Sequence, residues 1–65
     1  LFDMVKVIKV DSKLDDLEGL ENKLNKVFQD IHDKGSIILN INTFEGKING
    51  IAIVSYMIIV EEVDY

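Results

Sequence analysis

The sequence predicts an α+β fold in which one helix packs on a three-stranded mixed sheet, with the elements in the order β-α-β-β. Three observations predict it. One long segment has apolar residues spaced three and four apart, which is typical of a helix with one buried face. Three other segments are rich in β-branched residues, as strands are. Asp11 and Ser12 separate the first strand from the helix, glycine-containing turns separate the later segments, and we expect residues 1–65 to form one domain.

The first strand is predicted over Met4–Val10, where valine and isoleucine alternate with lysine. The apolar phase slips between Val7 and Ile8, which predicts either a β-bulge or a strand that is partly covered on both faces. We expect Met4 to be the natural first residue, with residues 1–3 added ahead of it.

The helix is predicted over Lys13–Asp33. Ser12 followed by Asp15 resembles a capping box at its start, and Gly35 is suited to the position just after its end. One stripe along the helix is apolar and is expected to face the sheet: Leu14, Leu17, Leu20, Leu24, Val27, Phe28 and Ile31.

The second strand is predicted over Ser36–Phe44 and the third over Ile51–Val60, with a hairpin loop at Glu45–Gly50 between them. Because the third strand is apolar on both faces, we place it in the centre of the sheet, in the order 1-3-2. The order 1-2-3 is the alternative. A single helix spans about the length of one strand and can cover only one face of this sheet.

One apolar row of the third strand is therefore left for a second chain. We expect the row that begins at Ile51 to lie under the helix, because the hydroxyl of Tyr56 suits an interface better than a core. The sequence thus predicts a homo-oligomer, a dimer or higher, that associates through the open sheet face. The predicted interface residues are Ile38, Val54, Tyr56, Ile58 and Val60.

Composition narrows the classes of function. The net charge of −5 and the absence of arginine disfavour direct binding of nucleic acid, which requires cationic side chains. The apolar run Ile51–Val60 is about half the length that a membrane span needs, so no membrane association is expected. The chain has no cysteine, which excludes disulfides and fits a cytoplasmic location.

No set of residues has the spacing of a catalytic or metal site, so neither an enzyme nor a cofactor is expected. His32 is the only histidine and is interpreted as a solvated side chain at the helix end. The serines lack a nucleophile motif. The acidic stretch Asp11–Glu18 could gather Ca²⁺, but it lacks the pattern of a calcium loop and is better explained as helix-start charge.

Three binding hypotheses remain. A polar patch within an apolar face could hold a small nucleotide-like ligand, and the candidate binding residues are Asn40, Asn42, Phe44, Lys47 and Tyr56. The loop at Glu45–Gly50, with Lys47, could bind a phosphate, although an ordinary hairpin is favoured. Acidic residues along the helix and tail could mimic the phosphates of DNA, although lysines interrupt the helix surface.

Three stretches of the chain, "VKVIKV", "DDLEGLENKLNKVF" and "SYMIIVEE", resemble a family of small sporulation-associated proteins of spore-forming bacteria and their phages. The resemblance covers most of the chain and implies a small non-enzymatic accessory protein. The same setting implies a phage anti-defence role, in which a small protein inhibits a protein partner or sequesters a nucleotide signal between subunits. A structural, self-assembling sporulation or phage component is the alternative.

Overall fold

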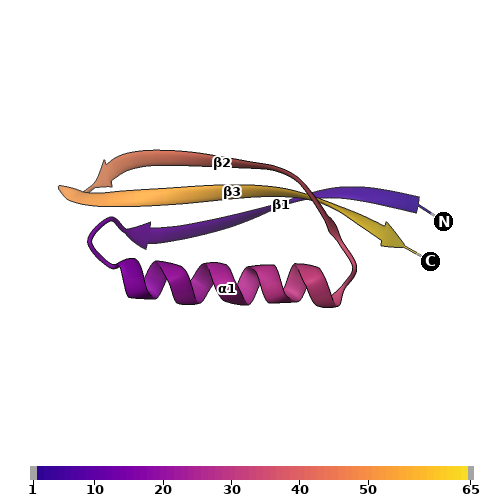
Figure 1. The fold of residues 1–65 in the computed structure, drawn as a ribbon. Helices are drawn as coiled ribbons and strands as arrows, with labels where there is room; N and C mark the ends of the chain where they lie inside the picture. Colours follow the sequence, from indigo (N-terminus) through magenta and orange to yellow (C-terminus); the bar gives the residue numbers. More distant parts are fainter. Residues whose placement is uncertain (1, 65) are drawn as a thin grey trace.

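The computed structural model describes residues 2–64, and the surroundings of the side chains for residues 4–62. Strand β1 spans Phe2–Lys13, helix α1 Leu17–Asp33, strand β2 Ile37–Ile48 and strand β3 Ile51–Asp64 (Figure 1). The predicted element order and the α+β class are confirmed. All three strands are longer than the sequence predicted.

The three strands form one sheet in the predicted order β1-β3-β2. The prediction of a mixed sheet is wrong, because β3 lies in the centre and pairs antiparallel with both neighbours. Strands β1 and β2 run in the same direction but do not pair with each other. Helix α1 connects them across the sheet.

The ladder irregularity lies in β2 rather than in β1. The pairing of β1 with β3 runs without a register shift past Val7 and Ile8. In β2 the register shifts between Ile38 and Asn40, so that Leu39 is an extra residue and the strand changes phase there. The predicted bulge in β1 is therefore absent, and the predicted cover on both faces is also wrong: the unbroken register puts Val5 and Val7 on the face opposite the helix, where both are exposed.

The helix begins four residues later than predicted, because β1 continues to Lys13. Asp16 is the N-cap, and its Oδ1 accepts a hydrogen bond from the backbone nitrogen of Gly19 at 3.0 Å. Ser12 therefore does not cap the helix and lies buried in β1. A Cβ on Gly19 would clash with the Asp16 carboxylate, which explains a glycine in the first turn.

Two turns depend on residues with positive φ. Gly35 follows the helix with a φ of 68°, as predicted for a residue just beyond the C-cap. Asn49 and Gly50 have φ values of 52° and 80° and join β2 to β3. This is the Asn-Gly pattern of a type I′ hairpin. Residues 45–48 of the predicted loop belong instead to β2.

The hydrophobic core lies between α1 and one face of the sheet. Val10, Ile31, Ile58 and Val60 form its buried centre, and partly buried side chains surround it: Ile8, Leu20, Leu24, Val27, Phe28 and Tyr56. The row of β3 under the helix is therefore the row of Val54, Tyr56, Ile58 and Val60. The prediction that the Ile51 row faces the helix is wrong.

The physical reason lies in the continuity of the two rows. The row beneath the helix is apolar from Ala52 to Val60, whereas the opposite row is broken by Ser55 and ends at Glu61. Burying the unbroken row removes more apolar surface from water and leaves the serine accessible.

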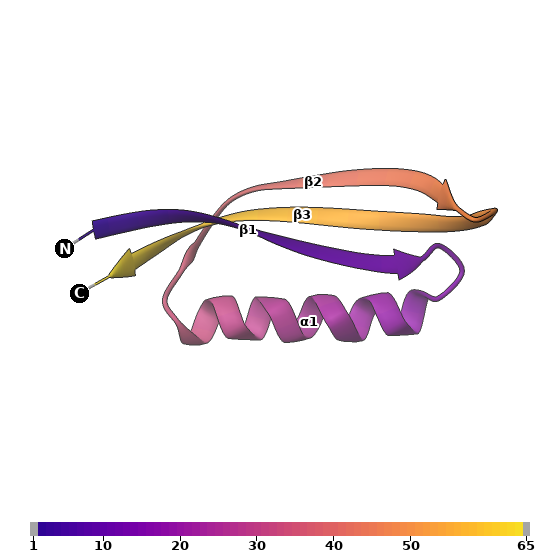
Figure 2. The same ribbon diagram turned by 180° about the vertical axis from the view of Figure 1, so that it is seen from behind.

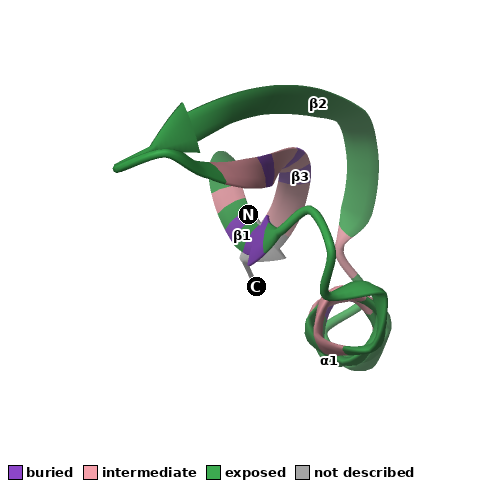
Figure 3. Ribbon diagram, turned by 90° about the vertical axis from the view of Figure 1, so that its left-hand side faces the viewer, coloured by how far each residue is buried: buried purple, intermediate pink, exposed green. Residues whose placement is uncertain are grey.

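The helix covers β1 and β3 but leaves β2 uncovered. In Figures 1 and 2 α1 runs beneath β1, while β2 lies on the far side of β3. Every residue of β2 is exposed, and the end-on view in Figure 3 shows this strand standing clear of the helix. The molecule is elongated, with extents of 46 × 18 × 15 Å. Its radius of gyration of 13.5 Å exceeds the roughly 11 Å of a compact chain of this length.

Candidate functional site: the open sheet face and the free edge of β2

The sheet face opposite the helix, called the open face below, has no cover within the described chain. Cross-strand partners share a face, so the register defines its members. They are Val5, Val7, Lys9, Asp11 and Lys13 from β1, Ile51, Ile53, Ser55, Met57, Ile59 and Glu61 from β3, and Ile37, Asn40, Asn42, Phe44, Gly46 and Ile48 from β2. Val5 is 65% exposed and Phe44 is 53% exposed, although both are large apolar residues.

A small polar group lies within the open face, between the apolar residues. Ser55 Oγ donates a hydrogen bond to Asp11 Oδ1 at 2.6 Å, and Lys9 Nζ lies 3.7 Å from Asp11 Oδ2. The single polar residue in the apolar run of β3 is therefore explained by a partner on β1. This group gives the β1 side of the open face a polar rim beside the exposed Val5 and Val7.

The candidate binding residues do not form one site. Asn40, Asn42 and Phe44 lie on the open face, facing Ile59, Met57 and Ser55 of β3. Tyr56 lies on the helix side, half-buried against the core, and Lys47 lies in β2 on that same side. Tyr56 was assigned to the wrong row, and Lys47 is in a strand rather than in a phosphate-binding loop.

The predicted interface residues all lie on the helix side of the sheet. Val54, Ile58 and Val60 are buried within the chain, so they are not available on an open face. Ile38 faces Val60 and remains 41% exposed because the helix does not reach β2. The open face carries Ile53, Met57 and Ile59 of β3 instead.

The outer edge of β2 has backbone groups that point away from the sheet. Ile48 and Ile51 flank a two-residue hairpin turn, so this pair exchanges backbone hydrogen bonds. Along an antiparallel ladder, hydrogen-bonded pairs alternate with pairs whose backbone groups point away from each other. The backbones of Gly46 and Phe44 therefore face β3, and those of Thr43, Glu45 and Lys47 face outward. The same alternation directs Ala52 toward β1, in agreement with the 3.0 Å hydrogen bond from Leu14 N to Ala52 O.

The two sheet edges are protected to different extents. On β1, Lys23 Nζ of the helix donates to the outward carbonyl oxygen of Asp11 at 2.8 Å. On β2, the side chain of Asn40 accepts from the nitrogen of Ile41 at 2.9 Å, beside the bulge. Beyond that point, from Thr43 to Lys47, no hydrogen bond to an outward backbone group is found in the described part of the chain. Such an edge is open to another strand.

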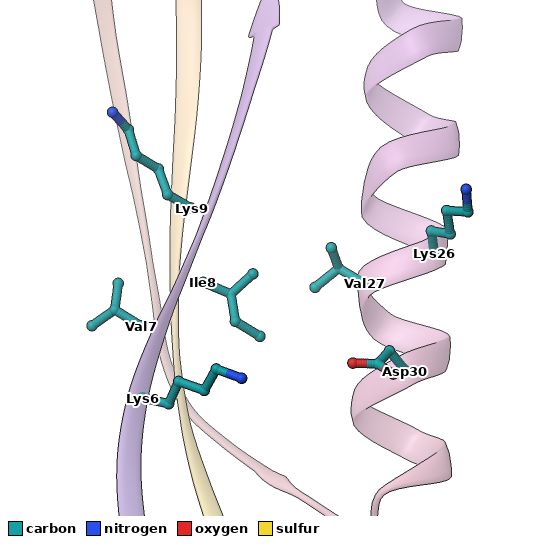
Figure 4. Close-up of a pocket in the computed structure, with 7 residues that line it drawn as sticks. All are labelled: Lys6, Val7, Ile8, Lys9, Lys26, Val27 and Asp30. Carbon is teal, nitrogen blue, oxygen red and sulfur yellow. The ribbon is translucent and has the colours of Figure 1, made fainter.

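A shallow groove of about 510 Å³ lies between β1 and α1. Ile8 and Val27 point toward each other across it, and Lys6 and Asp30 also extend into the space between β1 and α1 (Figure 4). Lys9 and Lys26 extend away from the groove. Lys6 Nζ is 3.6 Å from Glu62 Oε1, so this cation already has an anionic neighbour.

No constellation for catalysis or metal binding was found in the described residues. His32 is exposed at the C-terminal end of α1. Among the described residues, no three histidine or acidic side chains come together as metal ligands. The one helix found in this part of the chain is neither long enough nor apolar enough to cross a membrane.

Comparison of the chain with protein-family models, with curated proteins and with solved structures gave no match. The resemblance to the sporulation-associated family therefore stays a prediction, and the site is interpreted from its own geometry.

Proposed function

We propose that the protein acts by binding rather than by catalysis, as a homo-oligomer whose subunits pack through their open faces. The observation that supports this most is the excess of exposed surface. The chain exposes 4947 Å², whereas a compact monomer of 7.4 kDa would expose about 4200 Å². The difference of roughly 700 Å² is close to the 800 Å² or so that each partner buries in a standard interface.

The composition of the open face supports a second copy as the occupant. Its centre carries Ile53, Met57 and Ile59 on either side of Ser55, whose hydroxyl is paired with Asp11. Charged residues lie toward the rim: Lys9, Asp11 and Lys13 on β1, and Glu61 at the end of the β3 row. Interfaces commonly have an apolar centre and a polar rim. Two such sheets can stack about 10 Å apart with their side chains interdigitated, as in a β-sandwich.

Two variants of β1 with matched exposure test this arrangement. Val7 is 52% exposed on the open face, and Met4 is 51% exposed on the opposite face of the same strand. We expect Val7→Lys to lower the mass measured by light scattering toward that of the monomer, because it places a charge in the interface. Met4→Lys adds the same charge outside the interface and should leave the mass unchanged. Equal effects of the two substitutions would overturn the assignment of the face.

Within this oligomer, we propose an accessory role of the kind that the resemblance implies, as a phage or bacterial anti-defence protein. The partner is either a protein that the assembly inhibits or a small nucleotide-like ligand held between subunits. The amides of Asn40 and Asn42, next to the ring of Phe44, supply hydrogen-bonding groups and an aromatic surface on the open face. Native mass spectrometry of protein purified from cells should show a bound small mass if a ligand is held there. A ligand-free oligomer would contradict the sequestering role and leave inhibition of a protein partner.

A structural, self-assembling component is the second candidate. It is favoured by one observation, the unprotected edge of β2, which offers a contact separate from the open face. A chain with two separate self-contacts joins to more than one neighbour, so its assemblies grow with concentration.

A further inference from the structure

The free edge of β2 carries a short segment that is complementary to itself. Residues 44–48 read Phe-Glu-Gly-Lys-Ile. If two copies of this segment pair antiparallel about Gly46, each Glu45 faces the partner's Lys47, and each Phe44 faces the partner's Ile48. Opposite charges and aromatic–β-branched pairs are both favourable across antiparallel strands. The same contacts occur twice, as a two-fold interface requires.

The backbone geometry suits this register. Glu45 and Lys47 have their backbone groups directed outward, so each Glu45–Lys47 pair would exchange two hydrogen bonds between the chains. Gly46 then faces the partner's Gly46 as a non-hydrogen-bonded pair, in which the Cα atoms lie about 4.5 Å apart. The alternative register that places Glu45 opposite the partner's Glu45 is disfavoured, because it brings like charges together.

Gly46 has no explanation within its own chain. It is in the interior of β2, it does not have a positive φ, and a Cβ at this position would meet nothing within 4 Å. A glycine in a strand interior costs about 0.5–1 kcal/mol of stability relative to alanine. Strand glycines often mark a place where another backbone approaches closely. At Gly46 that backbone would belong to a second copy.

We propose that the free edge of β2 pairs antiparallel with β2 of a second copy, with Gly46 facing Gly46 on the two-fold axis. This inference rests on the self-association proposed above but uses a different surface. The paired segment covers residues 44–48 of each copy, so the two sheets join along their β2 edges close to the β2–β3 turns. The contact is small, and it joins a chain to a different neighbour from the one that packs on its open face.

Exchange of charge between the two paired positions tests the contact. Glu45→Lys places lysine opposite the partner's Lys47 at two sites, and Lys47→Glu places glutamate opposite the partner's Glu45. Each single variant should weaken the edge contact about tenfold. The doubly exchanged variant should restore it, and an equimolar mixture of the two single variants should associate as well as the wild type.

The change in net charge supplies an internal control. Glu45→Lys makes an acidic chain less negative, so general repulsion between copies falls, and a non-specific electrostatic effect would strengthen association. Edge pairing predicts the opposite result for this variant. Sedimentation velocity should be measured in the Val7→Lys background, where the open-face contact is removed and the edge contact is observed alone. If association in the Val7→Lys background is unchanged by Glu45→Lys and by Lys47→Glu, the proposal is overturned.

A cysteine scan tests the register. The chain has no cysteine, and a Cβ at Gly46 would meet no atom of its own chain within 4 Å. Under mild oxidation Gly46→Cys should give a disulfide-linked dimer, because Cα atoms about 4.5 Å apart lie within the range for a disulfide. Phe44→Cys and Ile48→Cys should give little disulfide-linked dimer, since neither residue faces the same residue of the second copy. Preferential cross-linking at residue 44 would show another register and overturn the one proposed.

The outcomes separate this proposal from the one before it. If the wild type stays monomeric and Gly46→Cys does not cross-link, both proposals fail. If Val7→Lys dissociates the wild-type oligomer while the charge exchanges and Gly46→Cys have no effect, the open-face contact stands and the edge contact is overturned. If the charge exchanges change association and Gly46→Cys cross-links, while Val7→Lys leaves association unchanged, the edge contact stands and the open-face contact is overturned.

Discussion

Adjacent isoleucines on β3 provide a matched test of which row faces the helix. Ile58 has none of its surface exposed, whereas Ile59 is half-buried on the open face. Replacement of a fully buried isoleucine by alanine typically costs about 2–5 kcal/mol. For Ile59→Ala in the monomer, partial burial sets the cost at about 1 kcal/mol. A chain of this length has a total stability of roughly 3–10 kcal/mol, so the first substitution threatens the fold and the second does not.

The assay is urea unfolding followed by circular dichroism, at a low and at a high protein concentration. In dilute protein Ile58→Ala should lose at least 1 kcal/mol more free energy of unfolding than Ile59→Ala. At high concentration the cost of Ile59→Ala should increase, because the wild-type side chain then also packs against a second copy. If the two variants lose equal stability in dilute protein, the row assignment is wrong.

Three further predictions concern local features. Asp16→Ala should lower the free energy of unfolding by about 0.5–2 kcal/mol through loss of the N-cap. Gly19→Ala should stabilise the chain only in the Asp16→Ala background, where no carboxylate meets the new Cβ. A double-mutant cycle by thermal unfolding measures this coupling. Gly50→Ala should lower the free energy of unfolding by about 1 kcal/mol, because its φ of 80° is unfavourable for a side chain; no change in the urea midpoint would contradict the assigned turn. Ser55→Ala should cost about 0.5–1.5 kcal/mol in dilute protein by removing the hydrogen bond to Asp11, and the same substitution in an Asp11→Ala chain should cost less.

The sequence predicted the arrangement of the strands better than their faces. Strand β3 was placed in the centre because both of its rows are apolar, and this reasoning was sufficient. The row that faces the helix is decided less by the hydroxyl of Tyr56 than by Ser55, which breaks the opposite row. Its partner Asp11 is 44 residues away in the sequence, so a strand register was needed to recognise the pair.

The free edge of β2 was missed because its residues were assigned to a loop. The glycine and lysine of "EGKING" suggested a long turn, but the Asn-Gly pair at 49–50 is sufficient to reverse the chain. Once Glu45–Ile48 is counted as strand, the self-complementary order of residues 44–48 can be read from the sequence. The bulge at Leu39 carries no comparable sequence signal.

The incomplete cover of the sheet follows from the width of its single described helix. A single helix has one apolar stripe, and here that stripe packs over β1 and β3. Strand β2 is therefore exposed at every residue, including Phe44 and Ile48. No element within the described residues covers it, and on the proposed association a second copy supplies that layer.

The molecular mass of the unmodified protein as a function of concentration tests this account most directly. Sedimentation equilibrium should show the mean mass rising from 7.4 kDa to at least twice that value as the concentration approaches the high micromolar range. A mean mass that stays at 7.4 kDa throughout would contradict the claim that a second copy covers the exposed sheet.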